Sequence, residues 1–269
     1  MRTDLEGDAS PTRYFINSIA RAFTVLEAFS SAHPRLSLGE LSHRSSLNKA
    51  TVRRFALTLC DLGYLKHDSG RQFSLTPKVL DLGSRFLQTL SLPEVAEPYL
   101  TKLAEQTHES VNLAIRDGTE ALYVLRITGA PRILTVNLHV GSRLPVHATS
   151  LGKALLMDAR DRGNLVGVLR DPPWQAYTRA TRTEPEQLLA DLEDARRLGC
   201  ALADGELEAG LRSIASPVRD ASGAIVAAMN VSTHSLRVPL EQLLGPMRTA
   251  LLETTTAVSQ ALGFRERPT

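Results

Sequence analysis

Residues 36–75 read LSLGELSHRSSLNKATVRRFALTLCDLGYLKHDSGRQFSL, and this stretch decides the fold of the first part of the chain. Its apolar spacing and turn residues predict a short helix, a polar turn, a longer helix ended by Gly63, and two extended segments around a turn. In order, these elements are 36–41, 45–48, 49–59, 64–67 and 71–75, with the last turn at 68–70. Helix, tight turn, helix and a ribbon with a basic tip form the layout of a winged helix-turn-helix, which typically reads DNA.

The longer helix separates apolar from basic positions when it is drawn at 100° per residue. One stripe, predicted to face the core, holds Val52, Phe55, Ala56, Leu59 and Leu62. Ala50, Arg53 and Arg54 fall on the opposite side, where basic groups could reach the bases and phosphates of a major groove. The alternative is an ordinary amphipathic helix whose arginines are solvated. The preceding helix and the wing favour DNA binding.

The expected contacts with DNA lie at the starts of the two helices and on the ribbon. They are Ser37, Asn48, Lys49, Ala50, Thr51, Arg53, Arg54, Lys66 and Arg71. Charge is concentrated in the same region, because residues 35–78 hold eight Lys and Arg against three Asp and Glu, whereas the whole chain has a net charge of only +2. A basic head on a nearly neutral body fits a protein that binds nucleic acid.

Length and composition predict two ordinary domains of a water-soluble protein, since 43% of the 269 residues are hydrophobic and 22% are charged. Two cysteines, Cys60 and Cys200, cannot form a disulfide framework, and Cys60 is expected to be a buried thiol. We find no apolar signal segment and no run near the roughly 20 apolar residues that span a bilayer. A cytoplasmic protein without membrane contact is therefore expected.

The predicted organisation has four parts: a disordered tail at 1–13, a winged helix-turn-helix at 14–76, a linker helix at 77–92 and a second domain at 93–265. Ser91-Leu92-Pro93 is expected to break the linker helix. In the second domain, helices are predicted at 94–108, 151–157, 184–198 and 240–262, and strands at 110–116, 121–127, 133–138, 213–219 and 224–233. This order predicts an α+β domain, with helices on the faces of an antiparallel sheet.

The second domain lacks the sequence patterns of common catalysts, namely G-x-S-x-G, G-x-x-x-x-G-K-[ST] and H-E-x-x-H. We therefore predict no catalytic residue, no metal and no cofactor. Asp204, Glu206 and Glu208 alternate, which favours a solvated or salt-bridged edge over acid–base chemistry. An enzyme that converts a small acid and carries a DNA-binding head stays open as an alternative, as does a DNA-binding module without a ligand.

The sequence of the second domain favours a ligand-binding pocket over a catalytic site. Thr149 and Ser150 precede a predicted helix, whose free N–H groups favour an anion such as a small carboxylate. Asn230 and Ser232 lie two apart in an apolar strand, so they share one face of the sheet. Such buried polar groups need partners, which are either a ligand or neighbouring backbone.

Long segments of the chain resemble the IclR family of transcriptional regulators. The strongest are GLRSIASPVRD at 210–220, AAMNVS at 227–232 and ATSLGKALL at 148–156. YFINSIARA at 14–22, together with LSLPE at 90–94 and HES at 108–110, is similar to the branch that controls aromatic-acid catabolism through the β-ketoadipate pathway.

The resemblance implies a winged helix-turn-helix, a linker helix and a GAF-like effector-binding domain. It also implies dimers, often paired into tetramers, on palindromic double-stranded operators. The effector is expected against the curved sheet, under the loop at Ser150 and Leu151. Matching positions add Asp204, Leu211, Ser213, Asn230 and Ser232, with Ile133 and Val136 as apolar lining.

Leu151 is larger than the small residues found in relatives that bind two- or three-carbon acids. The resemblance therefore favours an aromatic acid. Its carboxylate is expected at the helix N-terminus, and its ring hydroxyl beside Asp204 or Asn230. Effector binding would stabilise one arrangement of the sheet and its loop, and the linker helix would pass this choice to the DNA-binding heads.

Overall fold

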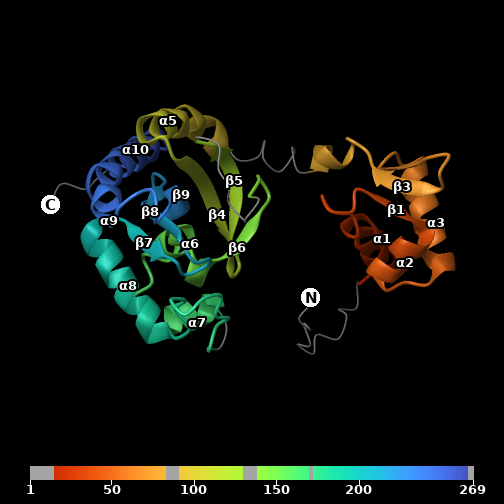
Figure 1. The fold of residues 1–269 in the computed structure, drawn as a ribbon, viewed down its shortest axis with the longest axis horizontal. Helices are drawn as coiled ribbons and strands as arrows, with labels where there is room; N and C mark the ends of the chain where they lie inside the picture. The colour runs from red at the N-terminus through yellow and green to blue at the C-terminus, as the bar shows by residue number, and fades with distance from the viewer. Residues whose placement is uncertain (1–14, 83–90, 130–137, 170–171, 266–269) are drawn as a thin grey trace. The chain divides into compact units, whose positions relative to one another are not determined.

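The computed structural model describes residues 15–82, 91–129, 138–169 and 172–265, and the chain divides into two compact units, 1–89 and 90–269. Each unit has its own hydrophobic core. Figure 1 labels the helices and strands along the chain.

The N-terminal unit is a winged helix-turn-helix. Its elements are α1 (Asn17–Glu27), β1 (Arg35–Ser37), α2 (Leu38–Ser45), α3 (Lys49–Asp61), β2 (Leu65–His67) and β3 (Gln72–Leu75). The wing is a three-stranded antiparallel sheet in the order β1-β3-β2, whereas the sequence predicted two strands. Residues 35–37 form the third strand, and α2 follows them directly. Ser37 ends β1 and also caps α2, since its Oγ accepts the N–H of Glu40 over 3.4 Å and its own N–H donates to the Glu40 carboxylate over 2.7 Å.

The core stripe predicted for α3 is confirmed at Val52, Ala56 and Leu59, which are buried. It is wrong at Leu62, which is 53% exposed. Leu62 is the C-cap of α3, and the chain turns away directly after it because Gly63 takes a φ of 79°. The side chain of Leu62 therefore lies beyond the last turn that packs on the core.

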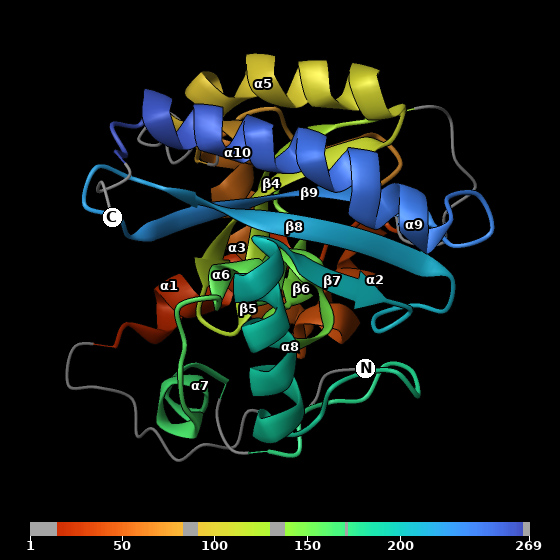
Figure 2. The same cartoon turned by 90° about the vertical axis from the view of Figure 1, so that its left-hand side faces the viewer.

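The C-terminal unit contains a six-stranded antiparallel sheet in the order β6-β5-β4-β9-β8-β7. Its strands are β4 (Ser110–Asp117), β5 (Glu120–Ile127), β6 (Arg143–Pro145), β7 (Ala201–Asp204), β8 (Leu211–Arg219) and β9 (Ile225–His234). Its α-helices are α5 (Ser91–Thr107), α6 (Ser150–Leu155), α7 (Arg162–Leu169), α8 (Pro185–Leu198), α9 (Leu240–Gln242) and α10 (Arg248–Ala261). Helices α5 and α10 pack together on one face, and α6 lies against the other (Figure 2). The α+β prediction is confirmed.

Several boundaries differ from the prediction. The short strands β6 and β7 at the two sheet edges were not predicted. Residues 91–93 form the first turn of α5 instead of a break, because proline is tolerated in the first turn of a helix. The predicted strand at 133–138 lies outside the described residues except for Leu138. Half of the predicted linker helix, residues 83–90, also lies outside them, and 79–82 are described as helical. The last helix is interrupted by a π-type turn at Leu243–Met247.

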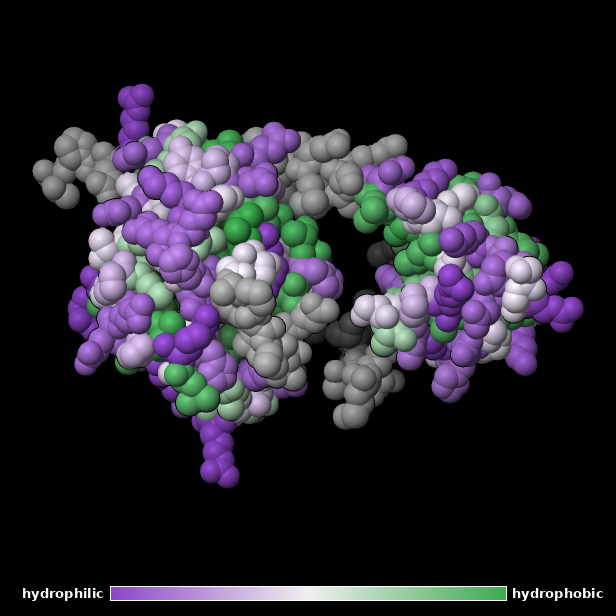
Figure 3. Space-filling model, turned by 45° about the horizontal axis from the view of Figure 1, so that its top comes forward, coloured by the Kyte–Doolittle hydropathy of each residue, from purple (hydrophilic) through white to green (hydrophobic). Residues whose placement is uncertain are grey.

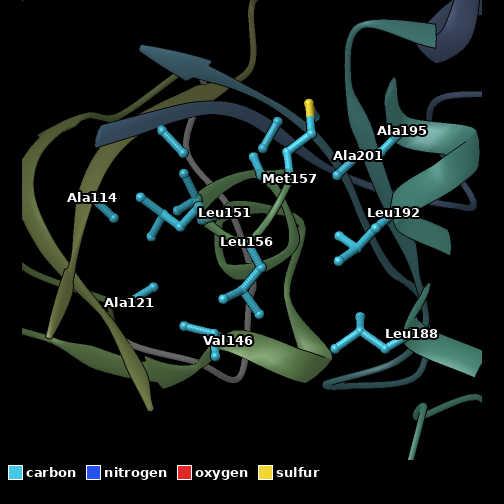
Figure 4. Close-up of a cluster of buried hydrophobic side chains, with 14 of the residues drawn as sticks. Ala114, Ala121, Val146, Leu151, Leu156, Met157, Leu188, Leu192, Ala195 and Ala201 are labelled. Atoms are coloured by element: carbon cyan, nitrogen blue, oxygen red, sulfur yellow. The ribbon is translucent and has the colours of Figure 1, made fainter. Parts of the chain in front are cut away.

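Helix α6 lies at the centre of the C-terminal core. Leu151 and Leu156 from this segment pack among side chains of the sheet and of α8, including Leu188 and Leu192 (Figure 4). The approach is close on the side of the preceding 3-10 turn, Val146–Ala148, where a Cβ on Gly152 would lie 2.1 Å from Val146 Cα. Packing in the core therefore fixes the position of α6, and with it the position of Ser150, the first residue of this helix.

Candidate functional site

Helix α3 presents a basic, unpaired surface at its N-terminal half. Asn48 caps the helix, and its Oδ1 accepts a hydrogen bond from Thr51 N–H over 2.9 Å. Lys49, Arg53 and Arg54 are exposed, as is Ala50. Within the described N-terminal unit, neither arginine forms an ion pair. The outward basic face predicted for this helix is therefore exposed, and its contacts with phosphates or base edges stay a prediction.

The wing adds two exposed basic residues, Lys66 on β2 and Arg71 directly before β3. Arg71 takes the left-handed conformation, with a φ of 57°. Asp68 closes the turn, since its Oδ1 accepts a hydrogen bond from Gln72 N–H. Of the nine predicted DNA-contact residues, Ser37 and Asn48 use their side-chain oxygens in helix caps, so these two position the helices as well.

A row of serines crosses the face of the large sheet that α6 covers. Ser110, Ser232 and Ser213 are direct register neighbours on β4, β9 and β8, and all three are buried. Ser150, the first residue of α6, is fully buried and shares a 2.7 Å hydrogen bond with Ser213 Oγ. The sheet and the start of α6 therefore meet through hydroxyl groups at this point.

A second polar row lies one pleat further along the same face. Arg126 on β5 donates from Nη1 to Asn112 Oδ1 over 2.8 Å, and Asn112 Nδ2 donates to Asn230 Oδ1 over 2.8 Å. The partner of Asn230 is therefore the side chain of Asn112, together with its backbone N–H. Burial lowers the pKa of the Arg126 guanidinium, because desolvation disfavours its charged form.

The serine row and Arg126 border a cavity with mixed polar and apolar walls. Its lining consists of Ser110, Tyr123, Arg126, Leu138, Leu144, Ala148, Thr149, Ala203, Glu206, Leu207, Glu208, Leu211, Ser213 and Ser232. Three predicted effector contacts, Leu211, Ser213 and Ser232, lie on this lining, and Ser150 reaches it through its bond to Ser213.

Other predicted effector residues lie elsewhere. Leu151 is fully buried in the hydrophobic core. Asp204 forms a two-bond ion pair with Arg212, at 2.9 and 2.8 Å, and lines a separate cavity beside α8. Asn230 is bound to Asn112 and is not on the lining. Ile133 and Val136 lie outside the described residues.

The start of α6 offers less to an anion than its sequence suggested. Thr149 Oγ1 accepts the N–H of Gly152 over 3.1 Å and donates to Pro145 O over 2.9 Å. One of the first free N–H groups of this six-residue helix is therefore already bound by protein.

Sequence reasoning missed a buried lysine behind the cavity. Lys153 on α6 has a side chain that is 1% exposed, and its Nζ lies 2.6 Å from both Asp191 Oδ2 and Glu206 Oε1. Glu206 is therefore not a solvated edge residue, although the salt-bridge part of that prediction holds. Burial raises the pKa of Glu206, and the lysine opposes this rise. Neither the burial of Lys153 nor its two partners is visible from spacing along the chain.

Across residues 15–82, 91–129, 138–169 and 172–265, no three His, Cys, Asp or Glu side chains gather as metal ligands. No helix in the same part of the chain has the length and apolar character needed to cross a membrane.

An exposed basic helix in a winged helix-turn-helix, joined to a separate domain with a polar cavity, defines a DNA-binding regulator with an effector domain. The chain belongs to the IclR family of bacterial transcriptional regulators. The IclR helix-turn-helix domain matches residues 18–69, and the bacterial transcriptional regulator IclR C-terminal domain matches residues 84–260. It is a regulator and not an enzyme.

Known relatives match nearly the whole chain. It is 42% identical over 229 residues to the Pca regulon regulatory protein of Pseudomonas putida, covering 85% of this chain and 78% of that protein. A crystal structure of a putative transcriptional regulator from Rhodococcus sp. RHA1 is 41% identical, with a TM-score of 0.81 and coverage of 92% and 98%. An IclR homologue from Microbacterium hydrocarbonoxydans, complexed with 4-hydroxybenzoate, is 27% identical, with a TM-score of 0.78 and coverage of 91% and 98%.

Proposed function

We propose that this regulator senses a small aromatic or dicarboxylic acid of the β-ketoadipate pathway and controls a catabolic operon. The cavity beside the serine row carries the proposal. Tyr123, Leu138 and Leu144 offer an apolar wall for a ring, while Ser110, Ser232 and Arg126 offer hydrogen-bond donors for oxygen atoms. The Pca name of one relative and the 4-hydroxybenzoate in another support the same ligand class.

Isothermal titration calorimetry tests the ligand class directly. We expect specific binding of 4-hydroxybenzoate, protocatechuate or β-ketoadipate, and weak or no binding of glyoxylate and pyruvate, which leave the apolar wall uncovered. If only glyoxylate and pyruvate bind, the proposal that the protein is a sensor stands, and the proposal that its ligand is an aromatic acid is wrong. Binding of none of these acids would overturn the ligand class.

We further propose that the chain acts as a dimer, or as a dimer of dimers, on a palindromic operator. Helix α1 and the residues before it expose Phe15, Ile16, Ile19 and Phe23, each at least 50%. Figure 3 shows hydrophobic patches among the hydrophilic surface of this unit. Apolar side chains gathered at helical spacing mark a protein contact. A two-fold contact would place two α3 helices on two equivalent half-sites.

Light scattering coupled to size exclusion tests the dimer. Ile19→Glu places a charge in the exposed stripe and should yield a smaller species than the unaltered protein. Leu236→Glu is the matched control, because Leu236 is a 92% exposed leucine in the C-terminal unit. The same mass for all three proteins would contradict this interface.

A further inference from the structure

Two residues on the described lining of the effector cavity carry a buried polar atom that has no partner. Among the described residues, Ser110 Oγ and Glu206 Oε2 are buried without a hydrogen bond, and both residues line this cavity. Leaving a buried polar group unpaired costs about 1–3 kcal/mol, so such groups call for a partner that the protein itself does not supply. The side chain of Glu206 is only 6% exposed, and Lys153 occupies its other oxygen.

Arg126 is the complementary feature of the cavity. It is the arginine on the described lining, and its Nη1 donates a 2.8 Å hydrogen bond to the neutral Asn112. Within the described chain no carboxylate pairs with it, whereas Arg182 and Arg212 of the same unit are each paired with an aspartate. A guanidinium carries five N–H donors, so Arg126 keeps donors for an anion.

The two groups belong to different walls. Arg126 lies on β5, and Glu206 follows shortly after β7. The strands β4, β9 and β8 separate β5 from β7 in the sheet. Figure 1 shows β5 and β7 on two sides of the C-terminal unit, with α6 between them. A ligand that meets both groups therefore needs polar atoms at both ends of an apolar spacer.

The charges on the two walls decide which end of such a ligand lies at which wall. Glu206 and Glu208 share the wall after β7 and would repel a carboxylate. We propose that Arg126 binds the carboxylate of the effector and that Glu206 Oε2 accepts a hydrogen bond from a hydroxyl at the far side of its ring. This assignment rests on the proposed aromatic-acid sensor and replaces the start of α6, Asp204 and Asn230 as the polar anchors. It names a hydroxylated aromatic carboxylate as the ligand class.

Calorimetry with three matched ligands tests the carboxylate end first. 4-Hydroxybenzoate, 4-hydroxybenzamide and benzoate differ only in the carboxylate or the hydroxyl. For the unaltered protein we expect the acid to bind about tenfold or more tightly than the amide, as expected for a charge-assisted pair. Arg126→Met should remove this preference by weakening acid binding alone. Arg116→Met, on the neighbouring strand β4, is the control and should retain the preference.

The hydroxyl end is tested with Glu206→Gln. The glutamine has a single acceptor oxygen, which would bind Lys153. Its amide NH₂ would then present a hydrogen-bond donor to the cavity in place of the carboxylate oxygen. We expect the preference for 4-hydroxybenzoate over benzoate to fall by about tenfold, with benzoate affinity retained. The exposed Glu193→Gln is the control, because its carboxylate lies on α8 and faces solvent.

The outcomes separate the two proposals. If the unaltered protein binds none of the aromatic acids, the proposed function fails, and the anchors fail with it. If it binds 4-hydroxybenzoate but Arg126→Met and Glu206→Gln keep both preferences, the anchors are wrong and the sensor stands. Circular dichroism checks folding. Should Arg126→Met not fold, Arg126→Lys and the ligand series on the unaltered protein decide, since equal binding of acid and amide there overturns the Arg126 anchor.

Discussion

Lys153 shows how strongly one residue can depend on its partners. Its ammonium group is held by Asp191, Glu206 and the carbonyl oxygen of Leu202. Removing one member of a buried charge cluster leaves the others uncompensated, which is far costlier than losing an exposed pair.

Lys153→Met should therefore destabilise the C-terminal unit by about 3–5 kcal/mol in urea unfolding, because Glu206 would lose the ammonium group that it binds. Arg162→Met is the control. Arg162 pairs with Glu186 at the surface, where both side chains are more than half exposed, and its loss should cost at most about 1 kcal/mol. Equal losses for the two variants would refute the buried-cluster account.

Arg53 and Arg54 are the residues on which DNA binding depends most directly. Replacing either with alanine should weaken operator binding by about tenfold and reduce the salt dependence of binding by about one phosphate contact. Fluorescence anisotropy at several salt concentrations measures both quantities. Lys102→Ala removes one exposed positive charge from α5 and should change neither. Arginine variants that bind as well as the unaltered protein would remove α3 from the interface.

The sequence predicted which side chains are exposed better than it predicted which side chains contact one another. The basic face of α3 follows from helical periodicity alone, so the exposure of Arg53 and Arg54 was predictable. The meeting of Ser110 with Ser232 depends on strand order, and the burial of Lys153 depends on α6 packing into the sheet. Neither is contained in local spacing, which is why Arg126 and Glu206 were not predicted as cavity residues.

Gly152 links the sequence of α6 to its packing as an element. A side chain there would collide with the backbone of Val146, so Gly152→Ala should lower the free energy of unfolding by about 3 kcal/mol. Gly167→Ala is the matched control. Gly167 lies in α7, where an added Cβ would have nothing within 4 Å, so alanine should stabilise the helix by up to about 1 kcal/mol. Thermal unfolding compares them, and equal effects would contradict the close approach.

Helices and strands with strong local sequence signals were predicted, whereas short strands that form only by pairing with a neighbouring strand were not. Helix α8 begins at Pro185 and is followed by Gly199 with a φ of 74°, as its flanking residues indicated. The β8–β9 hairpin turns at Asp220–Gly223, also as predicted. Strands β1, β6 and β7 have only three or four residues each, which is too short for an alternating pattern. They exist because a neighbouring strand offers hydrogen bonds.

At the scale of the whole molecule, the two units have separate cores. For the chain to act as a sensor, effector binding to the C-terminal unit must change DNA binding by the N-terminal unit. An effector changes DNA binding only if it prefers one of two arrangements of the protein. Thermodynamic linkage then requires the operator to change effector affinity by the same factor.

The central claim is best tested by measuring operator affinity with and without effector. The operator is a duplex selected by the protein from random sequences, and the effector is 4-hydroxybenzoate at saturation. We predict a change in the dissociation constant of about 5- to 150-fold, with an equal change in effector affinity when DNA is bound. Bound 4-hydroxybenzoate with an unchanged operator affinity would contradict the account.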